Sequence, residues 1–300
     1  MASILHAATV LLLRDSDRGL QVLLTKRAAG LSFMGGLWVF PGGRMEPADL
    51  SPELASRADL VSIAETASRM LGMRDGEPID VETARGLLMA ACRETFEESG
   101  VLLARPRGGG SDRWRRARFA RVSARRREAS ATAAAFLGLL VDEDLLLDVE
   151  RLVYWAHWIT PPAESKRFDT RFFALPVPED QEASVDLGEL THHAWLTEED
   201  VATHLASGEM LMAPPTRATL QDLWRSHERH GGLAAMLAAE RTRTVPPILP
   251  KSSVVEDGFE IVLPWDDRYA QTPGEGCVLL SSYPEYVRDM PSRMRLPQPR

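Results

Sequence analysis

Cysteine is scarce in this chain: Cys92 and Cys277 are the only two among 300 residues. Two cysteines cannot build the disulfide framework of a small secreted protein, and these two lack C-x-x-C metal spacing. No apolar run is long enough to span a bilayer, and the N-terminus lacks the basic n-region of a signal peptide. These absences predict a soluble protein of the reducing cytoplasm that has no membrane partner.

An excess of positive charge is also missing. The chain has 35 basic and 43 acidic residues, which give a net charge of −8. This balance argues against general nucleic-acid binding, because a polyanion needs a basic surface. It does not exclude a small phosphate-bearing ligand, since metal ions can lie between two negative groups.

Carboxylates, by contrast, gather near the end of one predicted helix. Asp80 is a suitable N-cap and Gly100 a suitable stop, so Glu94, Glu97 and Glu98 fall at i, i+3 and i+4 on one helix face. Like charges at this spacing repel, and the helix dipole disfavours them at a C-terminus. A solvated acidic face is the alternative. Three acids without a nearby His or Cys ligand favour a site for Mg²⁺ or Mn²⁺.

The residues around these acids resemble a known motif. Arg93–Val101 (RETFEESGV) is similar to the second half of the Nudix box, R-E-U-x-E-E-x-G-U, where U is aliphatic. Phe40–Gly43 (FPGG), followed by Asp49, resembles its first half. Asp49 replaces the usual Glu, and Thr95 fills an aliphatic position. The 43 residues from 50 to 92 stand where the family has seven, so the box is split by an insertion.

The resemblance implies a metal-dependent hydrolase and assigns roles to its residues. Arg93 is expected to pair with Asp49 and orient the box, and Glu94 is the first candidate for the base that activates water. Glu189 is a further candidate ligand, with a solvated loop position as the alternative. The implied catalytic residues are Arg93, Glu94, Glu97 and Glu98, and the implied metal ligands are the Gly43 carbonyl, Glu94, Glu97 and Glu98.

The segment before the box resembles the upstream signature of coenzyme A-cleaving Nudix enzymes, LLTxR(S/A)xxxRxxxGxxxFPGG. Arg27 matches its first Arg and is a candidate phosphate contact, or else a surface residue ending a strand. Ser32 replaces its second Arg. Phe40 belongs to the same candidate substrate-binding set. Arg167 is the third member, with a structural ion pair to Asp169 or Glu164 as the alternative.

The implied substrate is a nucleoside diphosphate linked to another moiety, with CoA or acyl-CoA first and ADP-ribose or an NADH-type dinucleotide second. A nucleotide-binding sensor that does not hydrolyse its ligand is an alternative of another class, although such domains usually lack the box acids. The resemblance also makes a homodimer possible.

The fold implied is an α+β (α/β/α) sandwich with a mixed sheet between helices. Residues 1–245 are expected to form one Nudix-like domain with helical insertions at 50–79 and 105–150, and 246–300 an extended C-terminal segment. The Arg-rich part of the second insertion is interpreted as a solvated helical hairpin, with a polyanion site as the alternative. A helix is expected to start at Thr197 and another at Thr216, after Pro214-Pro215. Strands are expected at 4–13, 20–25, 37–40, 101–104, 152–159, 167–175 and 191–196.

Overall fold

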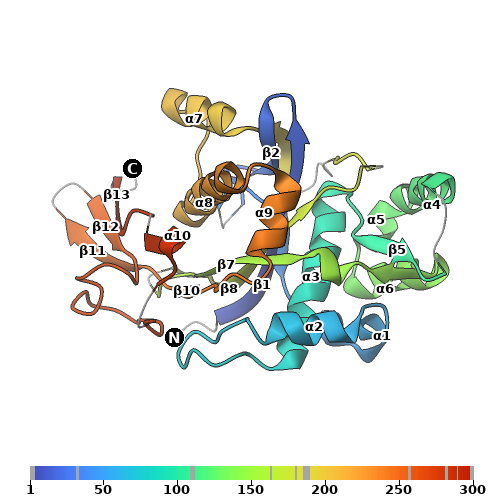
Figure 1. The fold of residues 1–300 in the computed structure, drawn as a ribbon, viewed down its shortest axis with the longest axis horizontal. Helices are drawn as coiled ribbons and strands as arrows, with labels where there is room; N and C mark the ends of the chain where they lie inside the picture. Colours follow the sequence, from blue (N-terminus) through green and yellow to red (C-terminus); the bar gives the residue numbers. More distant parts are fainter. Residues whose placement is uncertain are drawn as a thin grey trace.

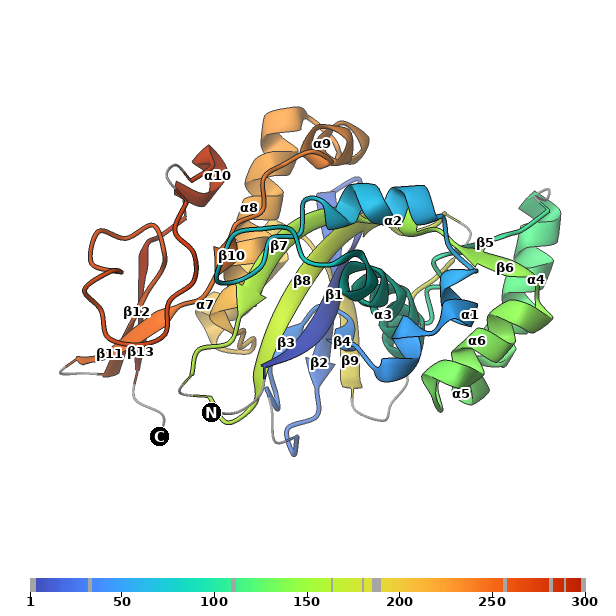
Figure 2. The same ribbon diagram turned by 90° about the horizontal axis from the view of Figure 1, so that it is seen from below.

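The computed structural model describes residues 4–31, 34–108, 112–162, 164–179, 181–184, 190–255, 258–280, 283–288 and 290–297. Its centre is a mixed sheet in the order β10-β7-β8-β1-β2-β3, with β4 paired to β1 and β9 to β2. The long strand β1 runs parallel to β8 and antiparallel to β2 and β4 (Figures 1 and 2). The bounds are β1 Ile4–Ser16, β2 Gly19–Arg27, β3 Trp38–Val39, β4 Gly42–Arg44, β7 Val153–Ile159, β8 Arg167–Pro176, β9 Leu190–Leu196 and β10 Pro247–Ile248.

Helices cover both faces of this sheet: α3 (Val81–Ser99) packs on one, and α8 (Pro214–His230) with α9 (Leu233–Glu240) on the other. The alternation of side chains along a strand explains the two cores. In β1, Val10 and Leu12 join the core under α3, whereas Leu11 and Leu13 join the core under α8 and α9. This arrangement confirms the predicted α+β sandwich.

Local capping chemistry sets the helix boundaries. The Asp80 side chain accepts the Thr83 N–H at the start of α3, and Thr197 forms a capping box with Asp200 at the start of α7 (Glu198–Ser207). Both predicted starts are confirmed. The predicted start of α8 is wrong by two residues, because Pro214 occupies the first turn, where a missing N–H costs nothing.

The 3₁₀ helix η1 (Pro47–Leu50) leads into the first insertion, which contains α1 (Pro52–Ala55) and α2 (Leu60–Ala67). Ile63, Ala67 and Met70 are buried in the core that α3 shares with the sheet. The insertion is therefore packed onto the helix that carries the acids, as Figure 2 shows for α2 and α3.

The second insertion packs on the other end of α3. It consists of β5 (Ala104–Pro106), α4 (Asp112–Ala124), α5 (Arg126–Ala129), α6 (Ala133–Asp142), β6 (Leu145–Leu147) and η2 (Val149–Arg151). Arg118 and Arg121 pair with Glu143, and Arg125 pairs with Asp142. These local ion pairs agree with a surface hairpin.

The strand predicted at 101–104 is wrong, because β5 begins only at Ala104. The Gln181 side-chain amide takes both backbone groups of Leu102: its Oε1 accepts the N–H at 2.7 Å and its Nε2 donates to the carbonyl at 2.9 Å. The side chain of Gln181 thus forms the hydrogen bonds with Leu102 that a neighbouring strand would form if Leu102 were in a strand.

The C-terminal residues form a second sheet of antiparallel strands, β11 (Lys251–Val255), β12 (Gly258–Val262) and β13 (Arg293–Pro297), together with α10 (Glu285–Arg288). Figure 2 places this sheet beside the β10 end of the central sheet. A small apolar cluster, which includes Ile159 from β7, Leu249 and Tyr269, joins the two.

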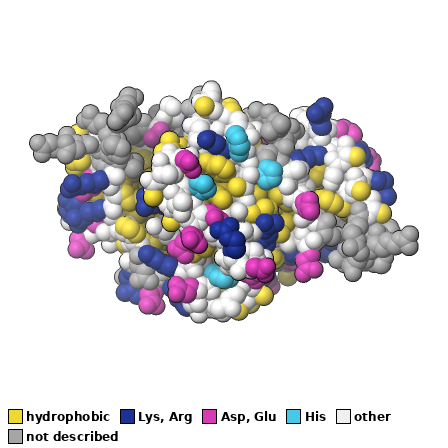
Figure 3. All heavy atoms as spheres, turned by 90° about the horizontal axis from the view of Figure 1, so that it is seen from above, with side chains coloured by type: hydrophobic (Ala, Val, Ile, Leu, Met, Phe, Trp, Pro, Cys, Tyr) yellow, Lys and Arg dark blue, Asp and Glu magenta, His cyan; other side chains and the backbone are white. Residues whose placement is uncertain are grey.

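On the face drawn in Figure 3, acidic and basic side chains are scattered among uncharged and hydrophobic ones. Within the described ranges, no helix combines the length and apolar character needed to cross a bilayer.

Candidate active site

The acids of the box lie on the last two turns of α3. The helix ends at Gly100, whose φ of 71° is left-handed and whose N–H donates to Phe96 O. Its last turn contains no basic residue of its own. The charge needed to offset Glu94, Glu97 and Glu98 must therefore come from residues outside this last turn.

Arg93 is the cation at the centre of the site. Its Nε and Nη2 donate to the two oxygens of Asp49 at 2.9 and 2.8 Å, and Nη2 also donates to Arg44 O at 3.1 Å. Arg93 is 3% exposed and Asp49 is fully buried. The predicted Arg93–Asp49 pair is confirmed, and the shorter Asp reaches because η1 brings its backbone close to the helix.

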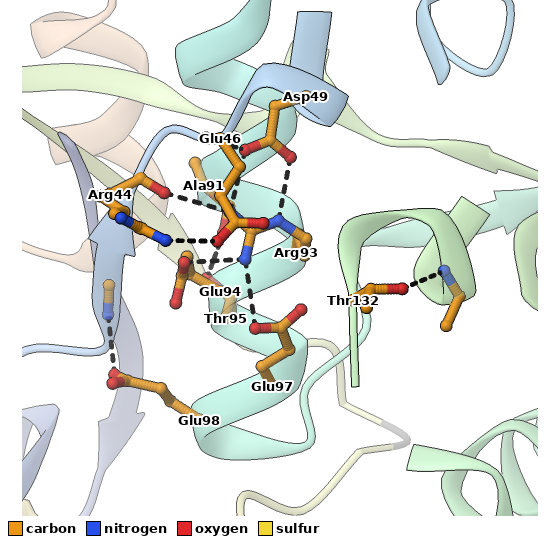
Figure 4. A network of polar contacts seen from close by, with 12 residues as sticks. Arg44, Glu46, Asp49, Ala91, Arg93, Glu94, Thr95, Glu97, Glu98 and Thr132 are labelled. Atoms are coloured by element: carbon orange, nitrogen blue, oxygen red, sulfur yellow. Dashed lines mark hydrogen bonds and ion pairs between the residues drawn. The ribbon is translucent and has the colours of Figure 1, made fainter. Parts of the chain in front are cut away.

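The same guanidinium holds two of the acids. Arg93 Nη1 donates to Glu94 Oε1 at 2.8 Å and to Glu97 Oε2 at 3.1 Å. Figure 4 shows Arg93 between Asp49 on one side and these two carboxylates on the other. A single buried cation therefore links both halves of the split box.

Strand β4 also contacts the acids, through Gly42 and Gly43. The Gly42 N–H donates to Glu98 Oε2 at 2.9 Å, the contact drawn at the lower left of Figure 4. A Cβ placed on Gly43 would lie 2.4 to 2.5 Å from the Glu94 carboxyl group. Glycine at 43 thus permits an approach between strand and carboxylate that another residue would block.

Burial changes the acidity of this cluster. Removal from water raises the pKa of Glu94, although Arg93 opposes the shift. The same cause raises the pKa of Glu97 to about 7, again against the effect of Arg93. Burial lowers the pKa of Arg93, but the surrounding carboxylates together raise this pKa by a larger amount. Arg93 therefore stays charged.

The donor set suits a hard divalent cation. Among the described residues, no three acidic, His or Cys side chains converge as ligands, because Glu94 and Glu97 contact Arg93 while Glu98 contacts Gly42. All the groups are nevertheless oxygen donors, they sit on adjacent turns of one helix, and Gly43 leaves the strand backbone bare beside Glu94. This chemistry fits Mg²⁺ or Mn²⁺ and not a thiophilic metal.

The substrate roles of Phe40, Arg167 and Arg27 stay predictions, but the structure shows the surroundings of the first two side chains. Phe40 is 3% exposed and packs edge-on against Phe172 at 6.2 Å between ring centroids, which makes it a core residue with little surface for a ligand. Arg167 is 4% exposed and pairs with Glu275 at 2.8 Å. The acid that pairs with Arg167 is Glu275 of the C-terminal segment, in place of the expected Asp169 or Glu164.

Arg27 ends β2 at the base of a loop. Its N–H donates to Leu37 O and its carbonyl accepts from Gly36 N, so the backbone of this residue closes the loop. The phosphate role of its side chain stays a prediction. Ser32 and Glu189 lie outside the described residues.

Three functional contacts were not anticipated from sequence: the N–H of Gly42, the carbonyl of Arg44 and the backbone contact of Glu46. Glu46 N–H donates to Asp49 Oδ2 at 2.8 Å and so helps to fix the carboxylate that holds Arg93. The FPGG motif marked the position of Gly42 but not its partner.

This fold and this site define the chain as a Nudix hydrolase. A Nudix hydrolase from Alicyclobacillus acidocaldarius of known structure is 29% identical, with a TM-score of 0.57 over 74% of this chain and 92% of that one. Residues 1–223 match the NUDT19 Nudix domain, and the chain belongs to that family.

Curated relatives extend the similarity beyond the domain. An acyl-coenzyme A diphosphatase NUDT19 of Xenopus laevis is 29% identical over 84% of this chain and 72% of its own length. The protein of the same name from Homo sapiens is 27% identical over 84% of this chain and 73% of its own. Both alignments span most of the sequence.

Substituting Gly43 by alanine should lower hydrolysis roughly 100-fold, because the new Cβ would displace the Glu94 carboxylate by about an ångström. Stability should fall by only about 1 kcal/mol, since the crowded atoms end a flexible side chain. Steady-state kinetics and urea unfolding measure the two effects. Gly138→Ala is the control, because nothing lies within 4 Å of its added Cβ. Equal activity in the two variants would contradict the assignment of Gly43.

Proposed function

We propose that this protein hydrolyses the pyrophosphate bond of CoA or acyl-CoA with the help of Mg²⁺ or Mn²⁺, yielding adenosine 3′,5′-bisphosphate and a phosphopantetheine fragment. The observation that carries the proposal is the cluster in which Arg93 links Asp49 to Glu94 and Glu97 while Glu98 contacts β4. The names of the two NUDT19 relatives support CoA derivatives as the substrate class.

In this proposal the chain's own groups have distinct tasks. Glu94, Glu97 and Glu98, with the Gly43 carbonyl, hold the metal. A cation held there would neutralise pyrophosphate oxygens and lower the pKa of a water molecule. Glu94 accepts a proton from the attacking water, because its carboxylate lies on the same helix face as the other proposed ligands and beside the bare backbone of Gly43.

The reaction balances without a further reactant. The water oxygen forms a bond to one phosphorus, and the bond from that phosphorus to the bridging oxygen breaks. The proton taken by Glu94 returns to the products. Arg93 stays in place throughout, because its Asp49 partner is buried and uses both oxygens.

A substrate panel tests the function. Purified protein should cleave CoA or acyl-CoA faster than ADP-ribose or NADH, and EDTA should stop the reaction. Products are separated by chromatography and identified by mass. Faster cleavage of ADP-ribose or NADH would favour the alternative substrates, and tight binding without cleavage would favour the sensor.

Metal affinity should depend on pH through Glu97. Because burial raises the pKa of Glu97 in the folded chain to about 7, above its ordinary value of 4.5, protonation favours the folded metal-free chain. The contribution of Glu97 to the free energy of unfolding is therefore full below pH 4.5 and is lost as the pH rises through about 7. A metal must compete with this proton, so Mn²⁺ affinity should rise about tenfold per pH unit below 7 and level off above it.

Calorimetric titration of the protein with Mn²⁺ between pH 5.5 and 8 measures this dependence. Glu97→Gln should bind more weakly and show a flatter profile, because the titrating group is gone. An unchanged slope in that variant would assign the dependence to another residue.

The homodimer and the cytoplasmic location stay predictions. Light scattering of the purified chain tests the first, and fractionation of cells that express it tests the second.

A further inference from the structure

We propose that Arg126, in the Arg-rich insertion, is a positioning residue that holds the last turn of α3 and thereby the metal-binding carboxylates of Glu97 and Glu98. In its guanidinium, Nη2 donates to Glu97 O at 2.8 Å, and Nη1 donates to Ser184 O at 2.8 Å and Ser184 Oγ at 3.0 Å. The inference rests on the metal role assigned to these acids above.

The end of α3 requires such a partner. The last carbonyls of a helix have no intrahelical donor. Here Phe96 O accepts from Gly100 N, Ser99 O accepts from Ser184 N at 2.8 Å, and Glu97 O accepts from Arg126. Because the last turn has no basic residue of its own, Arg126 brings positive charge to the negative end of the helix dipole.

The backbone leaves room for this guanidinium. A Cβ on Gly100 would lie 2.8 Å from Arg126 Nη1 and 3.0 Å from Ser184 Oγ. Glycine at 100 therefore serves two purposes: it permits the left-handed φ that ends the helix and it lets the side chain of Arg126 approach the carbonyls.

Arg126 is held from behind by a packed element. Ala129 of α5 and Phe136 of α6 are buried in the core under α3, and the Phe136 ring lies 6.0 Å from that of Phe96 between centroids. Arg126 can fix the backbone of α3 only if the helix that carries Arg126 is itself held in place. The packing of Ala129 and Phe136 holds that helix.

Besides Arg93, which holds the Glu97 carboxylate, two further anchors define where the last acids lie. The Glu98 side chain contacts β4 through Gly42, and the backbone of the preceding residue, Glu97, contacts α5 through Arg126. Loss of the second anchor frees the turn that carries both carboxylates while the apolar face of α3 stays buried. The Arg-rich insertion thus supports the site through the backbone of α3.

The experiment compares Arg126→Gln with Arg127→Gln, a matched change at the next, exposed residue. Mn²⁺ binding to the full chain is measured without substrate, by electron paramagnetic resonance of the free ion. Arg126→Gln should bind about tenfold or more weakly, and Arg127→Gln should match the wild type. Arg126→Lys should recover part of the affinity, because one ammonium can reach Glu97 O or Ser184 O but cannot reproduce the fork.

Circular dichroism establishes that each variant is folded, and Arg126→Lys carries the comparison if Arg126→Gln fails to fold. Equal Mn²⁺ affinity in the folded Arg126 variants and the Arg127 control would overturn the proposal, as would a wild type that binds no Mn²⁺. A wild type that binds Mn²⁺ without cleaving CoA overturns the proposed substrate alone and leaves the Arg126 comparison valid.

Discussion

Glu98→Gln should reduce turnover roughly 10³-fold with almost no loss of stability. The glutamine oxygen can still accept the Gly42 N–H, now 2.9 Å from Glu98 Oε2, so the contact between α3 and β4 survives. What disappears is a full negative charge at the proposed metal site. Because hard cations bind carboxylates much better than neutral amides, the loss should appear in metal activation and in kcat.

Glu82→Gln is the matched control for this substitution. Glu82 lies in the first turn of the same helix, is 68% exposed and pairs with Arg85 at 3.7 Å, so its replacement should leave activity unchanged. Activity is followed by product formation at saturating CoA and varied Mg²⁺, and folding by thermal melting. A Glu98→Gln enzyme with normal turnover would remove Glu98 from the metal site.

Asp49→Asn should destabilise the protein by about 3 kcal/mol, the range in which breaking a buried ion pair falls. Both Asp49 oxygens accept hydrogen bonds, from Arg93 Nε on one and from Arg93 Nη2 and Glu46 N on the other. Whichever way the asparagine amide is turned, its NH₂ faces a donor. Arg93 keeps Glu94 and Glu97 as partners, which places the loss near the lower end of the range.

Urea unfolding of Asp49→Asn beside Asp144→Asn measures this loss. Asp144 is 58% exposed and its ion-pair distances to Arg57 and Arg107 are 3.6 and 3.3 Å, so the control should change stability by less than about 1 kcal/mol. A loss this small in Asp49→Asn as well would mean that Arg93 is held mainly by the acids of α3. Activity should fall with stability, because Arg93 also orients Glu94.

Helix and strand boundaries were largely predictable because their causes are local. Asp80 and Thr197 cap their helices through the residue three positions on, and Gly100 ends α3 because only a left-handed residue fits there. The split Nudix box was recognisable despite its insertion, since the acids keep helical spacing within α3. The pairing of Arg93 with Asp49 followed from the resemblance and is confirmed.

Errors arose where a distant residue supplied the partner. Leu102 is not in a strand because Gln181, 79 positions away, takes its backbone groups. Arg167 pairs with Glu275, 108 positions away, and not with a neighbour. Phe40 occurs in a motif associated with substrate binding, yet its ring fills the core beside Phe172.

The placement of Glu94, Glu97 and Glu98 was therefore predictable from the amino-acid order alone, because helical spacing places them on one face whatever surrounds them. The construction of the site depended on folding in three dimensions. Gly42 and Glu98 are 56 positions apart, Asp49 and Arg93 are 44, and Glu97 and Arg126 are 29. Such contacts form only when separate elements pack against one core, and no local pattern encodes which elements will meet.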